Sequence, residues 1–194
     1  MPTQTTAPSP TLEDYRRQLD AIRRDADDLL GGLSDAQFNW RPDPHRWAVA
    51  ECVSHLNVSG AAYLPALDRS IADAREHGLT GGKPFRPGLL GGWMTRSMEP
   101  PPRMRMRAPK SILPAAPDRP LAEVQAEFMA LQDELERRFR DAEGVDLRRA
   151  RVTSPVASFL RVRLGDAFGF LLSHERRHLW QARRVREEPG FPKR

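Results

Sequence analysis

LRVRLGDAFGFLLSHERRHLWQARRV, residues 160–185, is the stretch that decides the fold. Its apolar residues recur at steps of three and four, which predicts one face of an α-helix over 160–185. His174 and His178 occupy two positions of that face. Burying two imidazoles costs free energy unless each finds a partner, and the i, i+4 spacing brings them together. A divalent metal ion is the simplest shared partner, and two core histidines bonded to carbonyls or carboxylates are the alternative.

The chain has 194 residues, which is enough for one domain with a sizeable core. Its single cysteine excludes an internal disulfide framework. No apolar run approaches the ~20 residues that span a bilayer, and nothing near the start of the chain resembles a signal peptide. We therefore expect a cytoplasmic protein with no membrane partner. A net charge of +5 is weak evidence for an anionic partner.

Three more apolar stripes of helical period precede residues 160–185. They predict helices at about 12–30, 47–76 and 120–139, the first of them capped by Thr11. Four amphipathic helices without a convincing strand pattern predict an all-α four-helix bundle. We assign residues 1–10 to a disordered tail, 11–188 to a single domain and 189–194 to a C-terminal tail.

Residues 78–118 form a long irregular crossover between the second and third predicted helices. This segment holds six glycines and eight prolines, with a short helix predicted at 89–98. Its length suffices to run back along a helix, so the second and third helices are predicted to be parallel. The crossover also carries seven basic and two acidic residues.

Arg103, Arg105 and Arg107 alternate with methionines in this crossover, so an extended conformation points all three arginines one way. We interpret the segment as a lid over a metal cavity, with some of these arginines holding an anionic substrate or thiol. Nucleic acid is the less favoured ligand. The simpler alternative is a connection whose apolar residues cover the bundle and whose arginines are solvated.

The second predicted helix supplies a candidate third ligand. Cys52 and His55 share a helical face in its most apolar half, which makes His55 a candidate metal ligand. Cys52 is interpreted as a small core residue in preference to a ligand or nucleophile. With Trp40 and Trp47, it is kept as a candidate substrate-binding residue.

Several short runs resemble the DinB-like superfamily, in an order and spacing that match from about residue 12 to residue 186. These runs are FNWRP at 38–42, WAVAE at 47–51, His55-Leu56, and HERRH at 174–178 followed by Gln181.

The resemblance implies a four-helix bundle, often dimeric, with a metal held by one histidine of the second helix and two of the fourth. In this chain those residues are His55, His174 and His178. Members with an assigned activity are S-transferases or isomerases that use low-molecular-weight thiols, or metal-dependent hydrolases. Ala48 departs from the family pattern, in which Ser or Thr commonly caps the second helix.

HERRH also fits the H-E-x-x-H pattern of zinc peptidases, in which Glu175 would be the general base. The longer metzincin pattern requires Gly and His at the positions of Gln181 and Arg184. No strand pattern indicates the sheet that usually accompanies such a site. We therefore favour the bundle, and expect Glu175, about 100° around the helix from His174, behind the ligands or at the surface.

Together these patterns predict a metal-binding protein, with zinc or nickel as the best match to imidazole ligands. Three protein ligands leave an open position for a low-molecular-weight thiol or a water, which would react with a small-molecule substrate. The other interpretation is a non-catalytic bundle, in which the metal is structural or absent and the protein binds a partner. A homodimer is implied by the resemblance alone.

Overall fold

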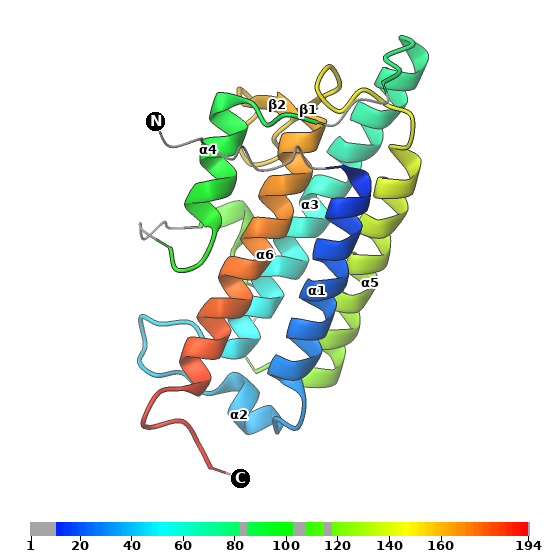
Figure 1. The fold of residues 1–194 in the computed structure, drawn as a ribbon. Helices are drawn as coiled ribbons and strands as arrows, with labels where there is room; N and C mark the ends of the chain where they lie inside the picture. Colours follow the sequence, from blue (N-terminus) through cyan, green and yellow to red (C-terminus); the bar gives the residue numbers. More distant parts are fainter. Residues whose placement is uncertain (1–10, 82–84, 103–107, 115–117, 194) are drawn as a thin grey trace, which may run out of the picture.

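A computed structural model of the chain describes residues 11–81, 85–102, 108–114 and 118–193. Its framework is an all-α bundle of four long helices, which confirms the predicted fold class (Figure 1). In chain order these helices are α1 (Leu12–Leu30), α3 (Val49–Glu76), α5 (Leu121–Asp141) and α6 (Leu164–Arg186). None of the described helices combines the length and apolarity needed to cross a bilayer.

Local sequence explains where the first two long helices begin. The Thr11 side chain accepts the N–H of Asp14 at 3.2 Å, and the Asp14 carboxylate accepts the Thr11 N–H at 2.7 Å. This reciprocal pair satisfies two N–H groups at the start of α1. Ala48 has no side-chain acceptor, but Glu51 accepts the Ala48 N–H at 2.9 Å. Half of the capping arrangement is therefore retained at the start of α3.

Cross-helix contacts fix the direction of each helix. Asn57 donates to the carbonyl of Val124 at 3.0 Å, and Arg138 donates to the carbonyl of Leu64 at 3.3 Å. Contacts between α3 and α5 therefore advance together along both helices, which confirms that these helices are parallel. The helices α1 and α6 run the opposite way, and Figure 1 shows the two parallel pairs packed against each other.

The crossover adds a fifth, shorter helix along the outside of α6. This helix, α4 (Leu89–Met98), begins and ends where the sequence predicted. An ion pair between Glu99 and Arg176 holds its C-terminal end to α6. A short 3-10 helix, η1 (Lys110–Ile112), follows in the crossover, while α2 (Asp35–Asn39) lies between α1 and α3.

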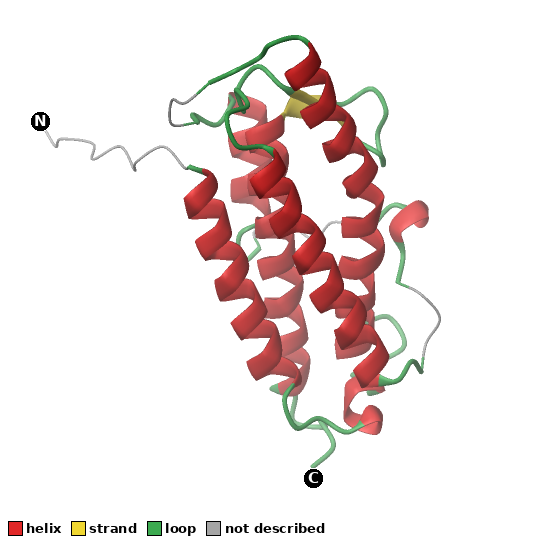
Figure 2. Cartoon of the chain, turned by 90° about the vertical axis from the view of Figure 1, so that its right-hand side faces the viewer, coloured by secondary structure: helices red, strands yellow, loops and turns green. Residues whose placement is uncertain are grey.

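A two-stranded antiparallel hairpin caps one end of the bundle, away from the C-terminus (Figure 2). Its strands are β1 (Arg151–Thr153) and β2 (Arg161–Arg163), for which the sequence showed no convincing pattern. The last predicted helix was placed too early, because residues 161–163 are strand and α6 begins at Leu164. Val152 and Val162 face the core, and three residues are too few for a recognisable strand alternation.

Candidate metal centre

Three histidines from two helices meet inside the bundle. His55 on α3 and His174 and His178 on α6 each offer one ring nitrogen, and these nitrogens lie within 4.8 Å of one another. None of the three side chains exposes more than 9% of its surface. The i, i+4 spacing places two of them on one face of α6, and α3 packs antiparallel to that face. The structure thus brings together the three residues that the sequence singled out.

The hydrogen bonds of His55 define which nitrogen faces the cluster. Its Nδ1 lies 2.6 Å from the carbonyl oxygen of Ile112, and its Nε2 lies 3.1 Å from Nε2 of His174. Because a carbonyl only accepts, Nδ1 of His55 donates to Ile112 and its Nε2 presents a lone pair to His174. Nδ1 of His178 is buried without a hydrogen-bond partner among the described residues.

This donor set fits a divalent ion. Two imidazole nitrogens bound to one tetrahedral zinc ion at about 2.0–2.1 Å lie about 3.3 Å apart. The 3.1 Å between the Nε2 atoms of His55 and His174 is close to that separation. The Ile112 carbonyl holds the His55 ring in place, in the way that outer partners orient metal-binding histidines.

Burial keeps all three imidazoles neutral. Desolvation lowers the pKa of His174 to about 3, with His55 and Arg177 adding to the effect. Desolvation likewise lowers the pKa of His55, and lowers the pKa of His178 well below its usual value. Neutral rings have the free lone pairs that metal binding requires.

Two aromatic rings cover the histidine cluster. Trp47 stacks on His178, with ring centroids 5.6 Å apart, and lies 5.1 Å from the ring of His55. Phe170 stacks on His174 at 5.8 Å. Trp47 is half-buried, so it stands at the edge of the cluster and not beneath it. The rings exclude water from two sides of the histidines.

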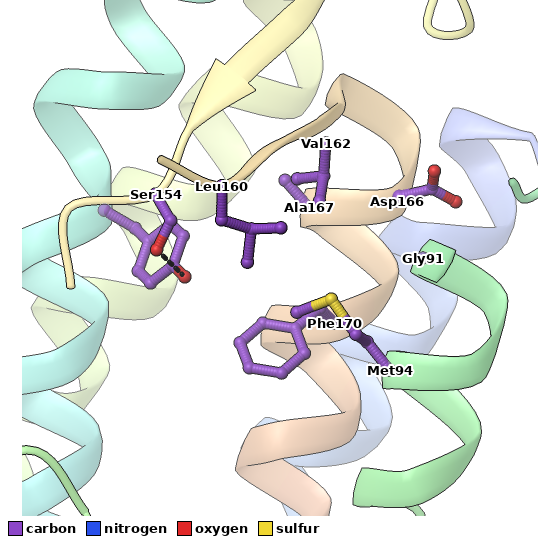
Figure 3. A pocket seen from close by; sticks show the side chains of 9 residues that line it. Gly91, Met94, Ser154, Leu160, Val162, Asp166, Ala167 and Phe170 are labelled. Atoms are coloured by element: carbon purple, nitrogen blue, oxygen red, sulfur yellow. Dashed lines mark hydrogen bonds between the residues drawn. The ribbon is translucent and has the colours of Figure 1, made fainter. Parts of the chain in front are cut away.

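The side of the cluster beyond Phe170 is closely packed. Figure 3 shows a cavity there, lined by Tyr63, Met94, Ser154 and Phe170 among others. Its volume is about 10 Å³, which is room for about one water. A hydrogen bond of 3.2 Å between the hydroxyl groups of Tyr63 and Ser154 crosses this region. This cavity, formed by described residues alone, is too small for a substrate.

The remaining candidate residues have different surroundings. Trp40 packs against Phe191, with ring centroids 5.6 Å apart. Cys52 is fully buried in the hydrophobic core, and burial raises the pKa of its thiol. Arg103, Arg105 and Arg107 lie outside the described residues. Substrate binding by these residues and by Trp47 stays a prediction.

Glu175, the residue that decides between a bundle site and a peptidase site, is buried between α5 and α6. Its Oε1 accepts a hydrogen bond of 3.0 Å from Gln132 of α5, and the side chain is only 4% exposed. Burial raises the pKa of Glu175 to about 7. The carboxyl group thus takes part in the contact with α5, behind the face that carries the histidines.

Sequence reasoning missed two neighbours of the cluster. Phe170 lies four residues before His174, so helical spacing alone could have placed it on the same face. The contribution of Ile112 had no sequence signal, because a backbone carbonyl is common to every residue and the contact spans 57 positions.

A comparison with protein families matches residues 18–182 to the DinB superfamily. This range includes all three histidines and every long helix apart from the start of α1 and the last turn of α6. Comparisons with curated proteins and with solved structures gave no match. A family match over most of the chain, on a four-helix bundle with three converging histidines, shows that the chain belongs to the DinB superfamily.

Proposed function

We propose that the protein binds one divalent ion, zinc or nickel, through His55, His174 and His178. We further propose that it uses this ion to transfer a low-molecular-weight thiol to or from a small-molecule substrate. The observation that carries the proposal is the convergence of three buried ring nitrogens within 4.8 Å. Imidazole nitrogen suits both metals.

Three protein ligands leave a coordination position for a thiol or water. The ion supplies Lewis-acid chemistry there, lowering the pKa of the group that binds to it. The chain itself orients the ligands, through the carbonyl of Ile112 on His55 and the rings of Trp47 and Phe170. Cys52, the single cysteine, is buried with a raised pKa. A reactive thiol would therefore come from outside the chain.

We place the substrate on the Trp47 side of the cluster. The cavity beyond Phe170 holds no more than about one water, so that cavity has no room for a substrate. Trp47 contacts two of the histidine rings and is only half-buried, which makes it the aromatic surface a substrate would meet. An aromatic face of this kind suits an apolar group next to the reacting atoms.

A structural metal is the second candidate, and the burial of all three histidines favours it. An ion that ties α3 to α6 would stabilise the bundle without any turnover. A peptidase is disfavoured, because Glu175 is bonded to Gln132 in the core.

Metal analysis tests the binding proposal. Protein reconstituted with zinc or nickel should hold about one ion per chain, and His174→Ala should lose it. The matched control is His45→Ala with His77→Ala, because both of these histidines are exposed. Wild-type protein that stays metal-free at micromolar metal would disprove the proposal.

A turnover screen then separates a catalytic from a structural ion. Metal-loaded protein is incubated with small thiols and electrophilic acceptors, and with peptides in parallel. Thiol transfer by the wild type that His174→Ala lacks supports the enzyme. Bound metal without turnover favours the structural role. Peptide cleavage that Glu175→Gln eliminates would instead show a metallopeptidase.

A further inference from the structure

An arginine-rich hollow lies at the hairpin end of the bundle, apart from the histidines. It has a volume of about 610 Å³ and is lined by Leu79, Asp146, Arg148, Arg149, Arg151 and Arg163. The loops that follow α3 and α5 supply some of these residues, and β1 and β2 supply the rest (Figure 1). His174 lies ten residues beyond the start of α6, or about 15 Å along its axis.

The register of the hairpin places two of these cations opposite each other. Arg151 pairs directly with Arg163 in the antiparallel ladder, while the neighbouring Val152 and Val162 pair toward the core. Like charges at directly opposed positions destabilise a strand pair. An anion between the two guanidinium groups would relieve this repulsion.

The four arginines are also short of carboxylate partners. Elsewhere arginines form ion pairs, such as Arg119 with Glu127 and Arg138 with Asp68. Within the described part of the chain, none of the four arginines that line the hollow forms a salt bridge. One of them, Arg163, donates to the carbonyl of Arg86 at 3.0 Å.

Two carboxylates nearby are already bonded to the backbone. Asp146 accepts the N–H of Arg148 at 2.9 Å and the N–H of Arg149 at 3.2 Å. Asp166, beneath the hairpin, accepts the N–H of Gly88 at 3.0 Å and is 5% exposed. These two acids offset part of the charge, but four guanidinium groups against two carboxylates leave the hollow positive.

We propose that this hollow binds a small organic anion with more than one phosphate group. Guanidinium groups match phosphate oxygens in a two-pronged geometry. The volume of the hollow, about 610 Å³, would accommodate a small organic anion. The arginines converge on one hollow, whereas a nucleic-acid surface would spread its cations along the path of a phosphate backbone.

The test is calorimetric titration of the full chain with fructose 1,6-bisphosphate as the probe, at constant ionic strength. We expect Arg151→Gln with Arg163→Gln to weaken binding by about tenfold or more. The matched control is Arg24→Gln with Arg69→Gln, which removes the same charge at exposed positions elsewhere and should change binding by less than about twofold. His174→Ala should bind as the wild type does, because the metal centre is a separate site.

The hairpin variant is expected to fold with an unchanged or higher Tm, since it removes a pair of opposed like charges. Should it fail to fold, Arg149→Gln in the exposed loop gives the same readout. Equal losses in the hairpin variant and its control would show non-specific attraction, and no binding at millimolar probe would show no site. Duplex DNA that binds wild type, is not displaced by the bisphosphate and is lost in the hairpin variant would replace the small anion with nucleic acid. Each of these three results would overturn the proposal.

Discussion

Glu175 and Gln132 form a buried pair in which each residue has one unused acceptor. Gln132 donates to Oε1 of Glu175, while Oε2 of Glu175 and Oε1 of Gln132 have no partner among the described residues. A glutamine at position 175 could accept the existing bond and donate to Oε1 of Gln132. Because the pKa of Glu175 is raised to about 7, its buried carboxyl group is mostly charged at about pH 8. We therefore expect Glu175→Gln to raise the free energy of unfolding by about 1 kcal/mol at that pH, as measured by urea denaturation.

The matched control for this change is Gln132→Leu, which removes the donor and leaves the carboxyl group of Glu175 unpaired. That variant should be less stable than the wild type. Metal content should be unchanged in Glu175→Gln, because His55, His174 and His178 form the cluster without it. A variant that loses its metal would contradict both the structural role of Glu175 and the three-histidine site.

At the scale of single residues, the sequence predicted the histidines because they interrupt an apolar helical period. That period also fixed which helix faces meet, so His55 could be placed with the pair on α6. The apolar period could not predict the contact with the carbonyl of Ile112, because the crossover that contains Ile112 has no regular pattern. It also could not separate Trp47, which contacts the cluster, from Trp40, which packs on Phe191.

Among the elements, α4 packs very closely against α6 at Gly91. A Cβ atom added at Gly91 would lie 2.1 Å from Cγ of Asp166, whose carboxylate is held by the N–H of Gly88. A Cβ added at Gly92 would meet only the tip of the Arg96 side chain, at 3.1 Å, and Pro87 at 3.4 Å.

We therefore expect opposite effects from two adjacent substitutions in α4. Gly91→Ala should lower the free energy of unfolding by about 1–3 kcal/mol, because Asp166 has to move. Gly92→Ala should be neutral or stabilising by up to about 1 kcal/mol, because alanine is the better helix former. Chemical denaturation of both variants measures the difference. Equal stabilities would mean that α4 does not pack on α6 at Gly91.

Asp166 at the start of α6 makes the stability of this contact depend on pH. Burial raises its pKa, although the N–H of Gly88 and the charge of Arg163 act in the other direction. The folded chain thus holds this proton more tightly than the unfolded chain, whose pKa is about 3.9. The contribution of Asp166 to the free energy of unfolding is fully present below the unfolded pKa. It is lost as the pH rises through the pKa of Asp166 in the folded chain.

Asp166→Asn removes this titration. The Tm of the variant minus that of the wild type should therefore become more positive from about pH 4 to about pH 7. Thermal unfolding followed by circular dichroism at several pH values measures this difference. A difference that becomes more negative would mean that the pKa of Asp166 is lowered in the folded chain.

The sequence predicted the long helices and α4 but missed the hairpin. Helices of 19 to 28 residues repeat their period several times, whereas β1 and β2 have three residues each. Each strand also contributes a single buried valine between polar or charged neighbours, which is too short a pattern to recognise. The pairing partner of a short strand lies elsewhere in the chain and leaves no local signal.

For the whole molecule, the direction of the helices decides where the histidines meet. The long crossover makes α3 and α5 parallel, and so places α3 antiparallel to α6. His55 in the first third of α3 then lies opposite the middle of α6, where His174 and His178 stand. A shorter connection would reverse α5 and change which faces the bundle buries.

Because the cluster joins α3 to α6, a bound ion should stabilise the whole bundle. An ion present at about 1,000 times its Kd adds about 4 kcal/mol to the free energy of unfolding, provided that it does not bind the unfolded chain. For a chain of this size that corresponds to a rise in Tm on the order of 10 °C. Differential scanning calorimetry with zinc, and again after chelation, measures the shift.

For each variant, the Tm with zinc is compared with the Tm of the same variant after chelation. A loss of packing caused by the substitution lowers both values and leaves their difference interpretable. His55→Ala should remove most of the metal-dependent rise, because α6 alone would then hold the ion and the link to α3 would be lost. His45→Ala with His77→Ala should keep the full rise, since both histidines are exposed. If His55→Ala kept the full rise as well, the ion would be bound by α6 alone or at another site, and the two-helix centre would be wrong.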